Sequence, residues 1–527
     1  MDRKALVGAL VIAAVWASQF VWIEPTNFSG TDEWLYLSLT SRGIVDFPHT
    51  QRPLTLLWTL PGALLRYRFL GFHLVDGAYL LMSGWLVLLL VRRLAPGDFV
   101  TALLAGILAV VWAPSDMARL LTVQTTVNTG ATFATLLALV LLAESWIRGR
   151  ILLFALACVG AVVAVQSYEA VAPMLLAGSL LPWLIEAGPG RKAGKWGGAY
   201  AVAVLLALGL TVLSLHRSQA SYQQMLGFDP RPSAVGARLL EQFGFHLRPL
   251  IELPPAAPIA MTAAVGTFLL GFSVVAVSQR GETAIGQRRL GVIAALGALL
   301  ATSAYLPFTL LSTTRTATRT QFLSSPGIAV LLASAAMLLS AIVPPRWRSV
   351  TAGLLGAWVV ALGTANTLTM QGLWTGMSAY PAQTSVLRQL TAGAPDVRPH
   401  TLLVLLDEEG AFPAVFTFRH AVGYLYERRA AGVVWGASDY LYSFAFDAEG
   451  VRLEPWPAIR KAWQDEPTRY SYDEVVVARR GADRQLVLLR DWPASLPALP
   501  PSARYDPEAR IVRGGPPVPA QRILYRP

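Results

Sequence analysis

Two adjacent acids, Asp32 and Glu33, follow the first apolar segment of the chain. Tyr36 lies one helical turn further on, and Arg52 stands before Pro53 in the same stretch. A carboxylate can accept the proton of an attacking hydroxyl group or orient that group. A guanidinium group matches phosphate oxygens and stabilises charge on a leaving phosphate. These residue types predict transfer from a phosphate-linked donor, with the two acids as candidate catalytic residues and with Tyr36 and Arg52 as candidate substrate-binding residues.

The elements that must position these side chains are membrane helices. The chain has 527 residues, of which 54% are hydrophobic and only 14% are charged. Apolar runs long enough to cross a bilayer, about 20 residues each, recur along most of the chain. This composition excludes a soluble globular protein and a disordered chain. The single cysteine, Cys158, excludes an intramolecular disulfide and a cysteine zinc site.

We predict eleven membrane-spanning helices. Their expected ranges are 5–23, 72–94, 99–114, 119–146, 151–166, 168–187, 196–216, 257–278, 289–311, 322–343 and 349–371. The stretch 53–69 is apolar but short, and it contains Pro61 and Gly62. We expect an amphipathic helix there, lying at the outer membrane surface, because a further span would reverse the side of every later loop.

Basic residues indicate which loops face the cytoplasm. They cluster at alternate helix ends: Arg3, Lys4, Arg92, Arg93, Arg148, Arg150, Arg191, Lys192, Lys195, Arg280, Arg288, Arg289, Arg346 and Arg348. Short loops rich in lysine and arginine mark the cytoplasmic face. We therefore expect an integral protein of a bacterial cytoplasmic membrane, with a cytoplasmic N-terminus and an external C-terminal segment. The same loops account for much of the net charge of +11, so we expect no nucleic-acid partner.

Five further candidates for substrate binding lie in loops expected on the outer side. They are Asp116, Tyr168, Glu169, Arg315 and Arg319. The loop 217–256 on that side is long and rich in proline. We predict that the outer acids and arginines converge on one cavity, with carboxylates at one end and guanidinium groups at the other.

The last 150 or so residues change in character. Thr401–Leu406 is expected to form a buried strand, followed by the acidic loop 407–410 and by a helix near 414–429. A hairpin is expected over 475–489, and residues 490–527 are expected to be irregular. We therefore predict an α-helical polytopic membrane domain over 1–371, with its first outer loop at 24–71, and a small external α/β domain over 372–527.

Residues 1–95 resemble the membrane glycosyltransferases of the GT-C superfamily, which include protein O-mannosyltransferases and aminoarabinose transferases. The resemblance rests on the first span, the Asp32-Glu33 pair, the helix around Tyr36 and the Arg52-Pro53-Leu54 entry into a surface helix. Over the later helices it is one of topology. It implies that Asp32 is the catalytic or acceptor-orienting acid and that Glu33 is the second member of an Asp-Glu pair.

The same resemblance implies the reaction and its partners. The reaction is transfer of a sugar from a polyprenyl-phosphate-linked donor to an acceptor on the outer face, with membrane lipid around the donor tail. Arg315 and Arg319 are candidates for the donor phosphate by their side and position. The acceptor is a protein, lipid or glycan that the sequence does not name. No cofactor is certain; a divalent metal is possible, but Asp116 stands alone in its loop and no second acidic pair supports a metal site.

Each candidate also has a simpler explanation, and these alternatives stay open. Asp32 could cap a helix, and Glu33 could favour the positive end of the helix dipole. Asp116 could begin a helix and Glu169 could lie in a solvated turn.

The arginines have simpler explanations as well. Arg52 could anchor the surface helix. Arg315 and Arg319, four residues apart, could contact lipid headgroups.

Other functions compete with glycosyl transfer. A transporter or flippase tends to place ionisable groups and broken helices near the bilayer midplane, whereas the acids singled out here lie at outer helix ends. A non-catalytic membrane scaffold that presents the C-terminal domain leaves the Asp32-Glu33 pair unexplained, although a helix cap would suffice. A ligase or polymerase of surface polysaccharide shares the donor chemistry but not this first loop.

Overall fold

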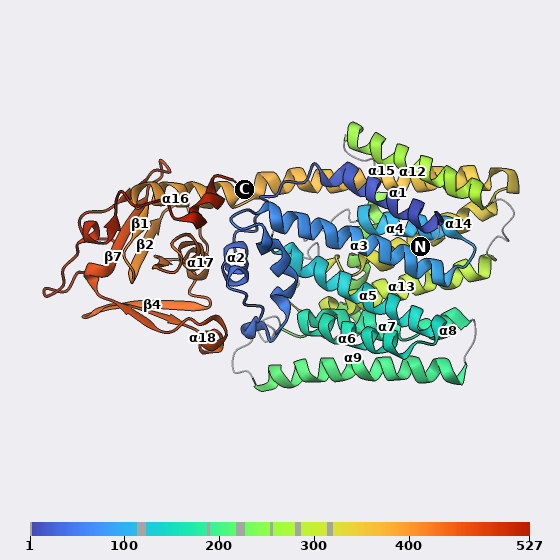
Figure 1. The fold of residues 1–527 in the computed structure, drawn as a ribbon, viewed down its shortest axis with the longest axis horizontal. Helices are drawn as coiled ribbons and strands as arrows, with labels where there is room; N and C mark the ends of the chain where they lie inside the picture. The colour runs from blue at the N-terminus through green and yellow to red at the C-terminus, as the bar shows by residue number, and fades with distance from the viewer. Residues whose placement is uncertain are drawn as a thin grey trace.

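A computed structural model describes residues 3–112, 123–186, 190–217, 227–252, 257–279, 286–312 and 320–526. Its helices form an elongated bundle, and an α/β region containing the C-terminus sits at one end of that bundle (Figure 1). The expected fold class, an α-helical polytopic membrane protein with a C-terminal α/β region, is confirmed.

Within the described ranges, nine helical segments are long and apolar enough to cross a membrane. They are α1 (Arg3–Phe20), α3 (Leu70–Leu94), α5 (Thr125–Arg148), Glu169–Glu186, α9 (Arg191–Arg217), α12 (Pro258–Ser278), α13 (Gln287–Thr309), α14 (Ser325–Ile342) and α15 with α16 (Pro345–Gly393). Two more apolar helices, α4 (Phe99–Val111) and α6 (Ile151–Ser167), are shorter. The exact number of eleven spans therefore stays a prediction.

Two predicted segments differ in the structure. The segment expected as one helix over 168–187 is broken into η4 (Glu169–Val171), α7 (Ala172–Gly178) and α8 (Leu181–Glu186). The long loop expected over 217–256 contains α11 (Pro232–Leu247) and the short η5 (Arg248–Leu250). Proline is favoured in the first turn of a helix, and Pro232 begins α11.

The stretch expected as a surface helix contains the 3₁₀ helix η2 (Thr55–Leu64). It packs into the bundle against α3 and α5. Trp58 lies directly over Gly130 of α5, where an added Cβ would meet the indole Cγ at 2.3 Å. The expected short helix is therefore present as a 3₁₀ helix, and its position at the outer membrane surface stays a prediction.

The basic helix ends gather at the end of the bundle remote from the α/β region (Figure 1). There Glu144 pairs with Arg93 at 2.5 Å and with Arg148 at 2.7 Å. Arg289 at the start of α13 donates to the carbonyl oxygen of Leu94 at the end of α3. The basic helix ends therefore lie together at one end of the bundle, as expected from basic loops at alternate helix ends.

The C-terminal region contains two main sheets. Strands β3 (Ala430–Val434), β2 (Thr401–Asp407) and β7 (Val475–Arg480) pair in parallel in that order, and β8 (Leu486–Leu488) adds an antiparallel edge. Helix α17 (Val415–Leu425) connects β2 to β3 and packs on the sheet. The predicted buried strand, helix and hairpin are confirmed.

Further elements complete this region. An antiparallel sheet of three strands and several short elements were not foreseen: β4 (Tyr442–Asp447), β5 (Gly450–Pro455), α18 (Pro457–Trp463), β6 (Thr468–Tyr470), η7 (Tyr472–Glu474), η8 (Pro507–Ala509) and η9 (Pro519–Leu524). A two-stranded sheet pairs β1 (Asp396–Val397) with β9 (Ile511–Val512). The last residues, expected to be irregular, thus return to the start of the region.

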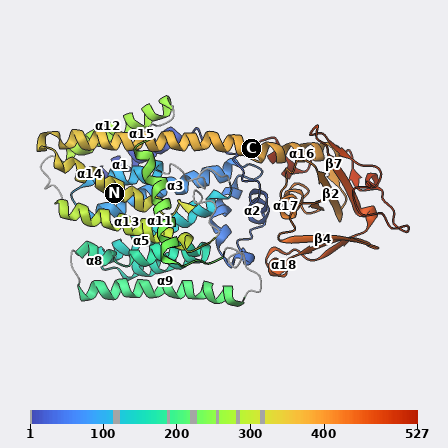
Figure 2. The ribbon, with the colours of Figure 1, turned by 180° about the vertical axis from the view of Figure 1, so that it is seen from behind.

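The first loop lies between the bundle and the α/β region. Helix α2 (Glu33–Ser41) packs against α17, and both views place α2 between the bundle and α17 (Figures 1 and 2). Helix α15 (Pro345–Met377) continues past residue 371 and is followed by α16 (Tyr380–Gly393). The division into domains at residue 371 stays a prediction.

Candidate functional site

Asp32 occupies the N-cap position of α2, but its side chain does not cap that helix. Gln124, which directly precedes α5, donates from Nε2 to Asp32 Oδ2 at 2.8 Å. The residue is only partly buried. The Asp32 carboxylate is therefore held by the residue that precedes α5 and does not cap α2. It remains accessible to solvent.

Glu33, the adjacent acid, is completely buried. Its Oε1 accepts from the backbone N–H of Ser29 at 2.5 Å, and its Oε2 accepts from that of Gly30 at 3.2 Å. Burial raises the pKa of this carboxyl to about 7; the Ser29 N–H opposes the rise, and the charge of Asp32 adds to it. Contacts of this kind favour a structural role for Glu33 over the expected catalytic one.

The backbone conformation of Gly30 allows the turn in the loop that carries Asp32 and Glu33. Its φ is +95°, a conformation that glycine adopts readily, and an added Cβ would meet the Cβ of Ala379 at 2.9 Å. Buried Gln383 of α16 donates to the carbonyl oxygen of Gly30 at 2.9 Å and accepts from the indole N–H of Trp34 at 2.9 Å. The loop that carries both acids is thus clamped by the α15–α16 connection.

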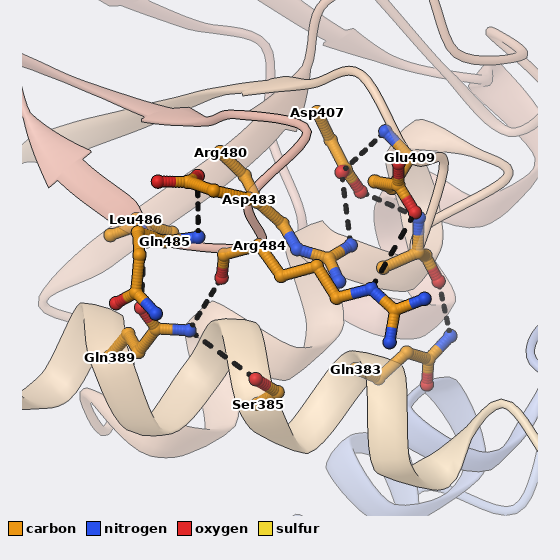
Figure 3. A network of polar contacts seen from close by, with 11 residues as sticks. Gln383, Ser385, Gln389, Asp407, Glu409, Arg480, Asp483, Arg484, Gln485 and Leu486 are labelled. Carbon is orange, nitrogen blue, oxygen red and sulfur yellow. Dashed lines mark hydrogen bonds and ion pairs between the residues drawn. The ribbon is translucent and has the colours of Figure 1, made fainter.

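The same Gln383 also reaches the C-terminal sheet. Its Nε2 donates to the carbonyl oxygen of Ala411 at 3.1 Å, next to the acidic loop (Figure 3). In that loop Asp407 accepts from the N–H groups of Glu409 and Ala411 and from buried Arg480 at 3.3 Å. The carboxyl ends of β2 and β7 are therefore tied through one glutamine to the loop of Asp32.

Arg52 and Glu169 form a two-pronged ion pair. Arg52 Nε lies 2.6 Å from Glu169 Oε2, and Arg52 Nη2 lies 2.7 Å from Glu169 Oε1. The guanidinium carbon stands 4.3 Å from the ring centre of Tyr168. Burial tends to lower the pKa of Arg52, but Glu169 and the phenols of Tyr168 and Tyr36 together hold it above its ordinary value. Arg52 is thus a permanent cation.

Backbone contacts fix this pair at the end of α6. The N–H of Leu54 donates to the carbonyl oxygen of Gln166 at 3.3 Å, and Thr55 Oγ1 donates to that of Ser167 at 3.1 Å. Tyr36 lies one turn of α2 after Asp32. Four of the predicted residues, Tyr36, Arg52, Tyr168 and Glu169, therefore form one cluster beside the helix that Asp32 begins.

Three predicted residues, Asp116, Arg315 and Arg319, lie outside the described residues. Among the residues that are described, no group of three or more histidine, cysteine, aspartate or glutamate side chains could hold a metal ion.

Sequence reasoning missed Asp76, a buried acid in α3. Thr129 of α5 donates to Asp76 Oδ1 at 2.6 Å. Its signal was a lone acid within an apolar span, a residue type that marks functional sites in membranes. Gln124 directly precedes α5 and Thr129 lies in its second turn, so the N-terminal end of α5 contacts both Asp32 and Asp76. Gln124 itself gave no signal, because a glutamine between Val123 and Thr125 has many ordinary roles.

Comparison with family models found no match, and comparison with curated proteins found none. Among solved structures, the chain is similar to the oligosaccharyltransferase of Archaeoglobus fulgidus. The apo form is 15% identical with a TM-score of 0.34, covering 69% of this chain and 55% of that one. AglB in complex with an inhibitory peptide and a dolichol-phosphate is 14% identical with a TM-score of 0.41, covering 83% and 64%.

A third structure, the complex of the same oligosaccharyltransferase with Zn and sulfate, is 14% identical with a TM-score of 0.33 and covers 83% of this chain. The chain spans 55% to 64% of the length of the chains in these three structures.

Proposed function

We propose that this chain is a membrane glycosyltransferase. In this proposal it transfers a sugar from a polyprenyl-phosphate-linked donor to an acceptor at the end of the bundle that carries the α/β region. Asp32 acts as the base or as the acid that orients the acceptor. The sugar and the acceptor are left open.

The observation that carries the proposal is the state of the Asp32 carboxylate. It is partly exposed, does not cap α2, and is held by Gln124 from another helix. A side chain fixed in this way suits general-base catalysis, which needs a carboxylate directed toward a substrate hydroxyl. Glu33, buried on the loop backbone, then acts as a positioning residue that shapes the segment before Asp32.

The proposed step is a substitution at the anomeric carbon. The acceptor hydroxyl oxygen attacks that carbon while its proton passes to the Asp32 carboxylate. The bond between the anomeric carbon and the phosphate oxygen breaks, and its electron pair leaves with the polyprenyl phosphate. Negative charge grows on the leaving phosphate, and nearby cations stabilise it.

Arg52 is the described residue best placed to supply such a cation. Glu169 engages its Nε and Nη2, while its Nη1 makes no hydrogen bond within the described residues. Tyr36, Tyr168 and Glu169 then hold the guanidinium group in place. The proposal keeps Asp116, Arg315 and Arg319 as substrate-binding candidates.

The side of the membrane is part of the proposal. The basic helix ends gather away from the α/β region (Figure 1), and clusters of this kind mark a cytoplasmic face. We therefore place the N-terminus in the cytoplasm and both Asp32 and the α/β region outside, in a bacterial cytoplasmic membrane.

A transporter or flippase is the second candidate. It is favoured by Asp76, an acid buried within α3, and by the break between α7 and α8 in the segment Glu169–Glu186. Ionisable groups inside spans and interrupted helices are typical of transport pathways.

The test compares Asp32→Asn with the wild-type protein in isolated membranes. A radiolabelled polyprenyl-phosphate hexose is supplied, and transfer to endogenous acceptor is measured. We expect Asp32→Asn to abolish transfer, because asparagine keeps the shape but cannot take the proton. The matched control is Asp98→Asn, since Asp98 caps α4 by accepting from the Thr101 N–H at 3.0 Å.

Three outcomes would count against the enzyme. The first is near-normal turnover in Asp32→Asn at equal expression, and the second is equal loss in Asp98→Asn. The third is movement of the intact labelled lipid across proteoliposomes without sugar transfer, which would instead favour the transporter.

A further inference from the structure

Three arginines surround one carboxylate where the first loop meets the α/β region. We call this group the Asp465 cluster; it consists of Arg42, Arg419, Arg428 and Asp465. Asp465 is 5% exposed and follows α18. Arg42 directly follows α2, Arg419 belongs to α17, and Arg428 lies just after α17. The cluster therefore joins segments that are distant in the chain, since Arg42 contacts a residue 421 positions away.

Backbone carbonyl groups hold two of the arginines in place. Arg42 donates from Nη2 to the carbonyl oxygen of Trp463. Arg428 donates from Nη2 to that of Gln464 at 2.8 Å. These two carbonyl groups immediately precede Asp465 in the chain, so the guanidinium groups converge from both sides of the junction.

The charges in the cluster do not balance. Three guanidinium groups face a single carboxylate. The neighbouring His420 is neutral, because burial lowers its pKa to about 3. The surrounding arginines lower this pKa further, whereas the charge of Asp465 acts to raise it. Tyr442 donates to Asp465 Oδ2 at 2.6 Å. Burial and the positive charge of Arg428 lower the pKa of Arg42, so these cations repel one another.

Arg419 and Arg428 do not form close ion pairs with Asp465. Arg419 and Arg428 approach its Oδ1 at 3.5 and 3.6 Å, whereas charge-assisted hydrogen bonds usually measure about 2.7–2.9 Å. The Arg52–Glu169 pair, at 2.6 and 2.7 Å, shows the close geometry that this chain can reach. In addition, Arg419 Nε is buried and makes no hydrogen bond within the described part of the chain.

We propose that the Asp465 cluster is a binding site for a phosphate-type anion. Such an anion would balance the surplus positive charge and accept the guanidinium hydrogens that Asp465 leaves unused. The anion can reach the site from solvent beside Arg42 and half-exposed Arg428. The negative charge of Asp465 limits the negative charge of the anion that the site can bind.

This site is distinct from a donor phosphate at Asp32. Asp32 and Arg42 flank the two ends of α2, which separates their Cα atoms by about 15 Å at 1.5 Å per residue. The cluster thus goes beyond the proposed reaction, and its binding can be measured whether or not the chain transfers sugar.

Two sources could supply the phosphate. Helices α2, α17 and α18 lie where the α/β region faces the end of the bundle (Figure 1), so a lipid headgroup can approach as well as a free phosphate. The shared chemistry is a phosphate carrying negative charge, and the two arms of the test separate the sources.

The test uses the full chain in neutral detergent and follows its thermal unfolding midpoint. One arm titrates inorganic phosphate against sodium chloride at equal ionic strength, and the other titrates short-chain phosphatidic acid. We expect phosphate to raise the midpoint and Arg428→Gln to weaken the apparent affinity about tenfold, since one charged contact is removed. A response to phosphatidic acid alone would support the same site with a lipid as its occupant.

The matched control is Arg484→Gln, because Arg484 is an exposed arginine of the same region that lies 3.9 Å from Glu409. It should respond like the wild-type protein. Arg42→Gln should weaken the apparent affinity as Arg428→Gln does, and Arg42→Lys replaces it if that variant does not fold. An unchanged response in Arg428→Gln, equal loss in Arg484→Gln, or no response of the wild-type protein in either arm would overturn the proposal.

Discussion

The buried carboxyl of Glu33 makes a strong prediction about the pH dependence of stability. Its pKa is raised from 4.5 to about 7 in the folded protein, chiefly by burial. Between these values the folded state holds a proton that the unfolded state has released. Stability from this group is therefore fully present below pH 4.5 and is lost as the pH rises to about 7.

The size of the effect follows from the two pKa values. Linkage between pH 5 and pH 8 gives a loss of about 2.5 kcal/mol, since each pKa unit corresponds to about 1.4 kcal/mol. Glu33→Gln has no proton to exchange and resembles the protonated carboxyl in shape. We expect the variant to lose this part of the pH dependence.

The assay is unfolding in mixed micelles by titration with sodium dodecyl sulfate, followed by tryptophan fluorescence at pH 5 and pH 8. The wild-type difference between the two pH values should exceed that of Glu33→Gln by about 2.5 kcal/mol. Glu24→Gln, which changes an exposed acid of the same loop, should keep the wild-type difference. If Glu33→Gln also keeps it, burial does not hold the proton on Glu33 and the reasoning is refuted.

Two further predictions concern contacts between distant segments. Either Arg52→Gln or Glu169→Gln alone should lower the unfolding free energy by about 2–3 kcal/mol, because each leaves a mostly buried charge without its partner. The double variant should recover part of that loss; strictly additive losses in the same micelle titration would exclude coupling. Gln383→Ala should lower the unfolding free energy by about 3 kcal/mol, because it removes the hydrogen-bond partner of the Trp34 indole N–H and of the Gly30 and Ala411 carbonyl groups. Hydrogen exchange of the 29–34 backbone should rise in this variant, and unchanged exchange would contradict the proposed clamp.

Local sequence patterns foretold much of the fold. Long apolar runs predicted most of the membrane helices, because a backbone in lipid must satisfy its own hydrogen bonds. The buried run Thr401–Leu406 predicted the central strand of the C-terminal sheet, because a strand covered on both faces is apolar along its whole length. Local pattern failed over 168–187, where one helix was expected and the segment is broken into η4, α7 and α8.

The candidate site was only partly readable. Sequence placed Asp32, Glu33, Tyr36 and Arg52 in one loop and made both acids catalytic candidates, with Asp32 as the base or acceptor-orienting acid. The structure separates them: Asp32 is partly exposed, whereas Glu33 is fully buried on the backbone of its own loop. The local sequence does not reveal which of two adjacent side chains at the start of a helix will be covered by a segment that is distant in the chain.

The sequence by itself determined a helical membrane chain, the end at which its basic residues gather and the presence of an acidic pair after the first helix. These properties follow from composition and from local periodicity. Only the tertiary structure decided that Arg52 meets Glu169, 117 positions away, and that Gln383 closes the loop of Trp34 from 349 positions away. The physical reason is that such partners are chosen by packing, which brings together side chains whose spacing in the chain carries no information about their distance in space.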